Sequence, residues 1–461
     1  MRGKKLSIDM SRGPLFSKII RYALPLMLAY LLQLAFHAAD MVVIGRWGSP
    51  ASLAAIGATV SITGLIINVL TGLATGANVL AAQFFGAKDS RNMTKLVHTT
   101  VAISIIGGIA AMLLGLLMAR WMVRVTDIPL ESQSKSTVYL VICFLGVPFQ
   151  ILYNFGSAIL RAIGNTRSPL YYLIISGTIN VLLNIFLVVV CRMDVAGVAL
   201  ATAAANAISA CLVLRRLQKN HGSTRLYLKN LRVDKNSLKG ILRLGVPAGL
   251  QSACFALSNI VVQSAINTFG VAAVAGLTAG YHIELLLYAV VFALHHTSIA
   301  VVGQNYGAKQ YKRIVKSMYI VAGVTTVATL VIGQLFYIFS PQLISIFSSD
   351  PEVIRYGVVR AGAMFTVYFL LGFMDISSGM IRGLGNSLYP AISTLAGTCG
   401  IRVLWTKFVF PHIGTMNSVL IVYPLSWILV AACNTAVLII MCRKLLRQNQ
   451  SNSPFIHPQV K

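Results

Sequence analysis

The sequence has very little negative charge. Its 461 residues include 11 aspartates and glutamates against 38 lysines and arginines, which gives a formal net charge of +27. Only 11% of the residues are charged, whereas a soluble protein has about 25%. With 57% hydrophobic residues and a mean hydropathy of +0.77, this composition excludes an ordinary soluble domain. It is typical of a protein that crosses a membrane many times.

The sequence also lacks the motifs of several enzyme classes. No H-E-x-x-H, G-x-S-x-G or Walker sequence occurs, so ATP is not expected to be the direct energy source. The seven cysteines form no C-x-x-C pair, and we interpret them as small apolar residues of membrane helices. A membrane-embedded enzyme is therefore the least favoured hypothesis, and we expect no cofactor and no metal cluster.

Twelve apolar segments are long enough to cross a bilayer as helices, for which about 20 residues are needed. They lie near residues 19–44, 52–84, 94–118, 137–160, 169–191, 195–217, 239–268, 272–303, 313–339, 354–380, 389–412 and 417–446. Helices are expected because a helix satisfies its own backbone hydrogen bonds in lipid. The first segment is too long for the core of a cleaved signal peptide, so we expect it to be the first span.

The second half of the sequence repeats the first. IIRYALP at 19–25 matches ILRLGVP at 241–247, AAQFFGAKDSRN at 81–92 matches VGQNYGAKQYKR at 302–313, and GSAILRAIGNTRSP at 156–169 matches SSGMIRGLGNSLYP at 377–390. The offsets of 222, 221 and 221 residues are nearly constant. Two six-span halves with the same orientation are typical of transporters built from parallel repeats.

The expected fold is therefore an all-α membrane protein whose twelve transmembrane helices form two pseudo-symmetric six-helix lobes around a central cleft. The predicted domains are an N-terminal arm (1–18), an N-lobe with spans 1–6 (19–217), a linker (218–238), a C-lobe with spans 7–12 (239–446) and a tail (447–461). The tail is polar after Gln448 and contains two prolines, so we expect it to be disordered.

Basic residues cluster in the arm, the linker and the C-terminal end, whereas the alternate loops hold few. The positive-inside rule therefore predicts that both termini and the linker are cytoplasmic, and it explains the net charge without nucleic acid as a partner. We expect a bacterial-type cytoplasmic (inner) membrane protein, surrounded by membrane lipid and monomeric.

Three of the 11 acids lie within apolar spans: Asp40, Glu284 and Asp375. A carboxylate there costs roughly 2.5–3.5 kcal/mol on insertion scales, so an ionisable residue in a span is by default a functional hypothesis. The alternative is a structural ion pair with an arginine of a span, for which the candidates are Arg161, Arg382 and Arg402. The repeat aligns Asp40 with Val262 and Asp375 with Asn154, so the scaffold is duplicated but the acids are not.

Polar residues accompany Asp40 in the first half. Gln33 and His37 share its helix face, and Asn180 and Asn184 share a face on the fifth span. A desolvated carboxyl group can exchange protons near neutral pH, and with amide and hydroxyl oxygens it can instead bind Na⁺. The coupling ion is therefore expected to be H⁺ or Na⁺. The predicted ion-coupling residues are Asp40, Asn180, Asn184, Thr202 and Asp375, and a Na⁺ site would use Asp40, Asn180 and Thr202.

Two tyrosines flank the acid of the eighth span. Tyr281 and Tyr288 stand at i−3 and i+4 from Glu284, which gives a mixed aromatic and acidic face. Such a face suits an organic cation through Coulomb attraction and cation–π contact, although tyrosines that merely pack are the alternative. The predicted partners are small organic cations. The predicted substrate-binding residues are Gln33, His37, Asn154, Glu284, Tyr281 and Tyr288.

These features resemble the multidrug and toxic compound extrusion (MATE) transporters. The resemblance rests on the two six-span halves, the G-A-K motif after spans 2 and 8, and the R-x-x-G-N motif after spans 4 and 10. GFMDISSGMIRGLGNS at 372–387 is similar to the bacterial branch with MepA-type drug exporters. The resemblance covers the chain except its two ends. It implies a multidrug efflux transporter that exports cationic or amphipathic compounds by antiport with H⁺ or Na⁺ as two lobes rock.

The resemblance also implies roles for particular residues. The acid of the family's first span matches Asp40, the asparagine of its fifth span matches Asn180, and the threonine of its sixth span matches Thr202. The acid that some members have in the tenth span matches Asp375. Many members carry an aspartate four residues after the asparagine of the fifth span, where this sequence has Asn184, so one proton-carrying or Na⁺-binding group is missing.

A flippase for a lipid-linked saccharide, from the same superfamily, is the alternative function. Such a protein should line its cleft with several arginines that hold pyrophosphate, whereas the spans here contain few, chiefly Arg402.

Some MATE members carry an acid in the seventh span, where this chain has only Gln251, Asn259 and Gln263.

Overall fold

The computed structural model describes residues 7–125 and 130–451, and these residues form helices with no β-strand. The predictions for the arm before Ser7 and for the tail after Ser451 concern residues outside these ranges. The helices of the first half are α1 (Leu15–Trp47), α2 (Pro50–Ala87), α3 (Ser90–Val125), α4 (Leu130–Ala162), α5 (Arg167–Asn184), the π-helix η1 (Ile185–Val190) and α6 (Asp194–Lys219).

The 3₁₀ turns η2 (Gly222–Thr224) and η3 (Leu228–Asn230) follow. The helices of the second half are α7 (Lys235–Asn267), α8 (Val271–Gly307), α9 (Tyr311–Ile338), α10 (Ser340–Ser345), α11 (Pro351–Met364), η4 (Phe365–Val367), α12 (Phe369–Gly383), α13 (Leu388–Thr394), η5 (Leu395–Gly400), α14 (Ile401–Leu404), η6 (Trp405–Val409), α15 (Phe410–Ile413), α16 (Met416–Leu420) and α17 (Val422–Ser451). The tail was predicted from residue 447, but α17 continues to Ser451.

The described chain packs as two compact units. Of the described residues, the first contains Ser7–Asp9 and Ile20–Leu257, and the second contains Met10–Ile19 and Ser258–Ser451. This division follows packing and runs through α7, so the lobe boundaries predicted around the linker stay a prediction.

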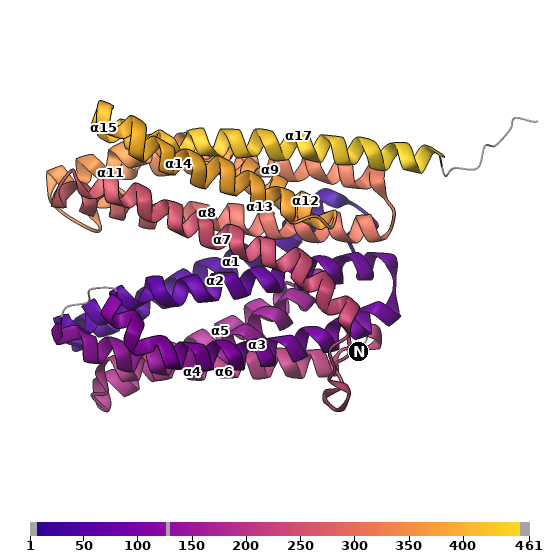
Figure 1. Cartoon of the computed structure of the whole chain (residues 1–461), viewed down its shortest axis with the longest axis horizontal. Coiled ribbons are helices and arrows are strands. Elements are labelled where there is room, and N and C mark those ends of the chain that lie inside the picture. Colours follow the sequence, from indigo (N-terminus) through magenta and orange to yellow (C-terminus); the bar gives the residue numbers. More distant parts are fainter. Residues whose placement is uncertain (1–6, 126–129, 452–461) are drawn as a thin grey trace, which may run out of the picture. The chain divides into compact units, whose positions relative to one another are not determined.

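In the first unit α4 lies between α2, α3 and α6, and the long helices run side by side (Figure 1). Their contact faces hold small residues that let the helices approach closely. A β-carbon on Gly115 of α3 would lie 2.2 Å from the ring of Phe144 on α4. Without a hydrophobic driving force between helices in lipid, such close van der Waals packing provides much of their association.

In the second unit α8 is the central helix, and it packs against α9, α11 and α12, while α12 also packs against α17. The segment predicted as the tenth span is bent by 50° between Pro351–Val367 and Phe369–Gly383. The segment predicted as the eleventh span is helical from Leu388 to Ile413, but α- and π-helical turns alternate along it.

Ten helices in the described residues are long and apolar enough to cross a membrane, and the bent pair α11–α12 makes eleven. The stretch from α13 to α15 coincides with the remaining predicted span. All twelve predicted segments are therefore helical, and the tenth and eleventh are interrupted by a bend and by π-helical turns.

The structure confirms the sequence repeat. Pro50 begins α2 and Val271 begins α8, 221 residues later, and the same offset separates Ser90 of α3 from Tyr311 of α9. The R-x-x-G-N turns contain Gly164 and Gly385 with φ of +85° and +90°, and glycine is the residue that adopts such angles without strain. The shared motif therefore encodes the same helix-ending turn twice.

The linker docks on the first unit. The backbone N–H of Tyr227 donates to Nε2 of His98 on α3 at 3.2 Å, and the two rings stack. Asp234 caps the start of α7, pairs with Lys95 at 3.1 Å and accepts from the backbone N–H of Ser237, which lowers the pKa of this carboxyl group. The stretch between the two predicted lobes is therefore an ordered strap along α3.

The crossing of α2 and α7 predicts a stability difference between two glycine substitutions. A β-carbon on Gly72 would lie 2.2 Å from the α-carbon of Gly249, whereas one on Gly107 of α3 would meet nothing within 4 Å. Gly72→Ala should therefore lower the thermal unfolding temperature, since overpacking costs about 1–3 kcal/mol. Gly107→Ala should leave the temperature unchanged in the same detergent, and equal effects of the two substitutions would contradict the crossing.

Candidate functional site

Asp40 of α1 meets two asparagines of α5. Nδ2 of Asn184 donates a hydrogen bond to Oδ1 of Asp40. When the Asn180 amide is oriented so that its oxygen accepts from the backbone N–H of Thr202 at 3.3 Å, its nitrogen also donates to Oδ1 of Asp40 at 3.0 Å. Both asparagines are buried, and among the described residues no side chain donates to the second oxygen, Oδ2. One carboxylate oxygen is thus held by two amides while the other is left for a ligand or a proton.

The local structure explains how the two asparagines reach the same carboxylate. Asn180 and Asn184 are one turn apart on α5, so both side chains project from one face. The π-helix η1 begins directly after Asn184 and widens the next turn. Single π-helical turns within α-helices frequently occur at functional sites.

The structure brings together most of the predicted ion-coupling residues of the first half. Asp40, Asn180 and Asn184 are in direct contact. Thr202 of the neighbouring helix α6 joins them, because its backbone N–H donates to the Asn180 oxygen. Among the described residues Asp40 forms no ion pair with a lysine or arginine. Within the first unit, the alternative of a structural ion pair with Arg161 therefore does not apply to this acid.

Two residues of α4 border this cluster and were missed by the sequence reasoning. Tyr139 and Cys143 share a hydrogen bond, and both lie close enough to Asp40 to interact with it electrostatically. Cys143 was interpreted only as a small apolar residue. The signal that could have found the pair is the i, i+4 spacing of two polar groups on an apolar span.

Gln33 and His37 are not part of the cluster. They lie on α1 with exposed side chains, whereas Asp40 is half-buried. Among the described residues no hydrogen bond connects either of them to Asp40 or to the two asparagines. Their predicted role in substrate binding stays a prediction.

Asp375 of α12 has a different environment in the second unit. The hydroxyl of Tyr288 on α8 donates to Oδ2 of Asp375 at 3.2 Å, and the ring nitrogen Nδ1 of His295 bonds its backbone carbonyl at 2.7 Å. Arg382 lies near enough to interact with the carboxylate electrostatically. Its repeat counterpart Asn154 instead donates to Oγ1 of Thr71 at 3.4 Å. Asp375 is therefore held by a phenol, whereas Asp40 is held by amides.

Glu284 is held in a buried ion pair. Its Oε2 accepts from Nη2 of Arg360 at 2.7 Å and from Nε at 3.2 Å, and both side chains are nearly inaccessible. Arg360 was not among the arginines proposed as partners, which is a correction. Tyr281 packs its ring against the Arg360 guanidinium at 5.4 Å, while Tyr288 turns to Asp375. Tyr281 and Glu284 thus meet Arg360 while Tyr288 meets Asp375, and the predicted role of the three residues in substrate binding stays a prediction.

Arg402 lies in the same unit, where α14 is enclosed by two π-helical turns. It is completely buried, its guanidinium lies 4.5 Å from the centre of the Tyr423 ring, and its Nη1 donates to Oδ1 of Asn259 at 2.6 Å. Asn259 occupies the part of α7 in which some relatives were expected to carry an acid. It provides an amide oxygen for a guanidinium instead.

Comparison with known proteins gives matches in both halves. The model of the MatE family matches residues 25–186 and 247–406, and the two matches begin 222 residues apart, in agreement with the repeat. A protein named "Probable multidrug resistance protein YoeA", from Bacillus subtilis, is 26% identical over 421 residues, which cover 87% of this chain and 88% of that protein. The "Multidrug export protein MepA" of Staphylococcus aureus is 22% identical over 436 residues, covering 89% and 94%.

A solved structure of a transporter of the MOP superfamily from Pyrococcus furiosus superimposes with a TM-score of 0.89. It covers 97% of this chain and 100% of its own chain at 20% sequence identity. The polarity of its binding pocket is described as reversed, with a different function suggested for that protein. At this identity the likeness shows the fold alone.

The Glu284–Arg360 pair predicts strongly non-additive substitutions. Arg360→Ala leaves a buried carboxylate without its partner and should destabilise the protein by about 3–5 kcal/mol. The double variant Glu284→Gln with Arg360→Met should be closer to the wild type, because neither charge remains. The thermal unfolding temperature in detergent measures both effects.

The exposed pair Arg355–Glu352, with a separation of 3.8 Å, provides the matched control. Arg355→Ala should change the unfolding temperature little, since exposed ion pairs contribute about 0–1 kcal/mol. If Arg360→Ala behaved like Arg355→Ala, Glu284 would not depend on its buried partner.

Proposed function

Because this chain belongs to the MatE family, we propose that it is a multidrug efflux transporter which exports cationic or amphipathic organic compounds by antiport with an inward-moving ion. The chain is a multi-pass membrane protein and a transporter rather than an enzyme. The relatives that match it along most of their length are multidrug resistance and export proteins. The bacterial cytoplasmic membrane, with both termini on the cytoplasmic side, is the location that the charge distribution favours.

The observation that carries the antiport is the environment of Asp40. A carboxylate in an apolar span is stabilised there by two amide donors instead of by a fixed positive charge. Hydrogen bonds to charged groups contribute about 1.5–3 kcal/mol and those between neutral groups about 0.5–1.5 kcal/mol. Neutralising Asp40 therefore weakens the attachment of α1 to α5 by about 1 kcal/mol per bond. An ion that binds Asp40 can in this way favour one arrangement of α1 over another.

Of the two expected coupling ions, the arrangement favours H⁺. When Asn180 accepts from the backbone N–H of Thr202, the amide nitrogens of Asn180 and Asn184 both face the carboxylate. A Na⁺ ion needs oxygen ligands, so both amides would have to rotate before they could join Asp40 and Thr202 around it. A proton needs only the free oxygen Oδ2. We therefore propose that Asp40 is the proton carrier.

The asparagine at position 184 limits the number of protons at this site. With Asn184 in place of an aspartate, Asp40 is the single carboxylate of the cluster, so the site exchanges one proton per cycle. The exchange of one proton for one monovalent organic cation moves no net charge. The Tyr288–Asp375 pair of the second unit offers an aromatic ring beside a carboxylate and is our proposed contact for the cation.

The lipid-linked saccharide flippase is less well supported. Its pyrophosphate would need arginines that are available to a ligand. Arg360 is committed to Glu284, and Arg402 is packed on Tyr423 and bonded to Asn259. A purified protein that bound a lipid-linked pyrophosphate in preference to organic cations would reverse this order.

Proteoliposomes test the coupling ion. With a pH gradient and a Na⁺ gradient imposed separately, transport of a fluorescent organic cation should follow the pH gradient. Asp40→Asn should reduce the driven rate by about 5–150-fold, the range that corresponds to a coupling free energy of about 1–3 kcal/mol. The control is Glu352→Gln, which changes an exposed acid of α11. Transport that responds only to Na⁺, or full transport by Asp40→Asn, would refute proton carriage by Asp40.

The single carboxylate predicts electroneutral exchange. At a fixed pH gradient, a potassium diffusion potential set with valinomycin should leave the wild-type rate for a monovalent cation unchanged. Asn184→Asp adds a second carboxylate beside Asp40, so its transport should become sensitive to the potential. Potential-dependent transport by the wild type would show that other groups carry protons in the same cycle.

A further inference from the structure

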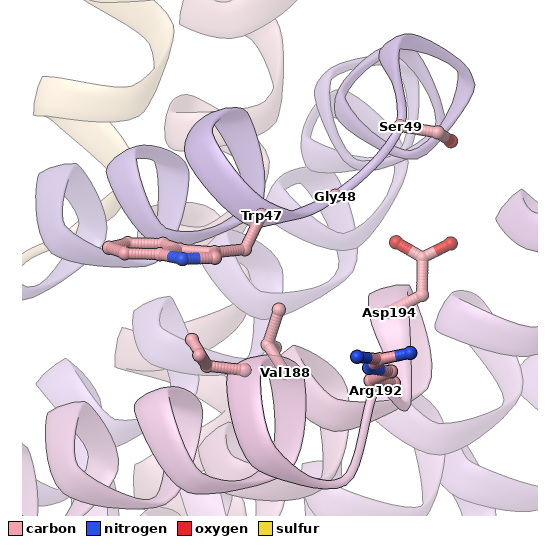
Figure 2. A pocket seen from close by; sticks show the side chains of 7 residues that line it. Trp47, Gly48, Ser49, Val188, Arg192 and Asp194 are labelled. Carbon is pink, nitrogen blue, oxygen red and sulfur yellow. The ribbon is translucent and has the colours of Figure 1, made fainter.

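A cavity of about 480 Å³ lies at the end of the first unit where α1 finishes. It is lined by Trp47 at the end of α1, by Gly48 and Ser49, by Val188 and Val189 of η1, by Arg192 and by Asp194, the first residue of α6. Figure 2 shows Trp47 on one side, Arg192 and Asp194 on the other, and Val188 between them. The cavity is thus built by α1 and η1, the elements that also carry and adjoin Asp40 and Asn184.

Asp194 presents one satisfied and one unsatisfied oxygen. Its Oδ2 accepts from Nζ of Lys135 and from Oγ of Ser52, both at 2.7 Å, and Lys135 also bonds Oγ of Ser49 at 2.7 Å. Its Oδ1 is buried and has no hydrogen-bond partner among the described residues. A buried acceptor without a partner costs about 1–3 kcal/mol, so this oxygen is suited to a donor from a ligand.

Arg192 supplies the opposite polarity. Lys135 and Asp194 form a neutral pair, so the Arg192 guanidinium gives the lining a net positive charge. Arg192 and Asp194 both have left-handed backbone angles, with φ of +54° and +51°. Such angles are uncommon outside glycine, and the strain they carry occurs preferentially at functional sites. The turn thus brings an anion-binding and an ammonium-binding group to one cavity.

Apart from Ser49, the rest of the lining has no polar side chain that accepts a hydrogen bond, and it lies at a helix end. The Trp47 side chain is 53% exposed, and Val188 and Val189 cover the floor. Tryptophans at the ends of membrane helices lie at the level of the lipid headgroups, with the ring against apolar chains. In the predicted orientation this is the outer end of the spans.

We propose that this cavity binds the headgroup of a zwitterionic aminophospholipid of the phosphatidylethanolamine type. Arg192 binds the phosphate through its guanidinium, as guanidinium groups bind phosphate in a bidentate manner. Oδ1 of Asp194 accepts a hydrogen bond from the primary ammonium. Trp47 and the two valines cover the glycerol and the first part of the acyl chains. A choline headgroup has no N–H to donate to Asp194, so the cavity selects ethanolamine. This inference does not depend on the transport function.

Fluorescence of Trp47 tests the proposal. The full-length protein is reconstituted into vesicles of phosphatidylcholine that contain a small fraction of acyl-brominated phosphatidylethanolamine or of acyl-brominated phosphatidylcholine. Subtracting the signal of Trp47→Phe isolates quenching at Trp47 from that of the other three tryptophans. The wild type should prefer ethanolamine over choline at least about tenfold, as expected for one hydrogen bond to a charged group.

Two variants separate the two contacts. Asp194→Asn keeps an oxygen for Lys135 and should remove the preference for ethanolamine. Arg192 lies outside the Lys135–Asp194 ion pair, and Arg192→Gln should weaken binding of both lipids. The control Arg46→Gln changes an exposed arginine that does not line the cavity and should leave the preference intact. Equal quenching by both lipids in the wild type would refute the headgroup assignment. Equal quenching by both lipids, together with a change in Trp47 fluorescence on adding soluble phosphoethanolamine, would show that the ligand is a solute and not a lipid.

Discussion

The structure depends on how a charge is accommodated in an apolar helix. A carboxylate in a membrane span is costly unless nearby groups compensate it, and the chain uses three different kinds of partner. Amides hold Asp40, a guanidinium holds Glu284, and a phenol holds Asp375. An arginine partner fixes the charge, because the pair is neutral only while both groups are ionised. Amide partners permit Asp40 to gain or lose a proton without leaving a second buried charge behind.

The duplicated scaffold and the unduplicated chemistry have separate physical origins. The turns of both halves are fixed by backbone requirements, such as the positive φ of Gly164 and Gly385. These requirements are the same wherever a helix must end and reverse. The acids depend instead on local partners, which differ between the halves. The repeat therefore aligns Asp40 with the apolar Val262 and Asp375 with Asn154. A protein built in this way can keep two similar units for support while each unit binds a different ligand.

The positions of the helices and the identity of the first-unit cluster could be predicted from the sequence. Apolar length sets the spans, and the spacing of Asn180 and Asn184 puts both on one face of α5. The partner of Glu284 could not be predicted, because Arg360 is 76 residues away and no local pattern relates the two. The i, i+4 spacing of Glu284 and Tyr288 was misleading for a similar reason. Neighbours on a helix face diverge when different helices pack against each of them.

The sequence by itself determined the class of the protein, the number and order of its helical segments, the repeat and the presence of three acids where lipid makes charge expensive. These features follow from composition and spacing, which act along the chain. Only the tertiary structure decided which acid has an arginine, which has amides and which has a tyrosine. It also decided that Asp194 and Arg192 line a cavity with Trp47. Such pairings depend on which helices lie side by side, and this arrangement is determined by packing between segments that are distant in the sequence.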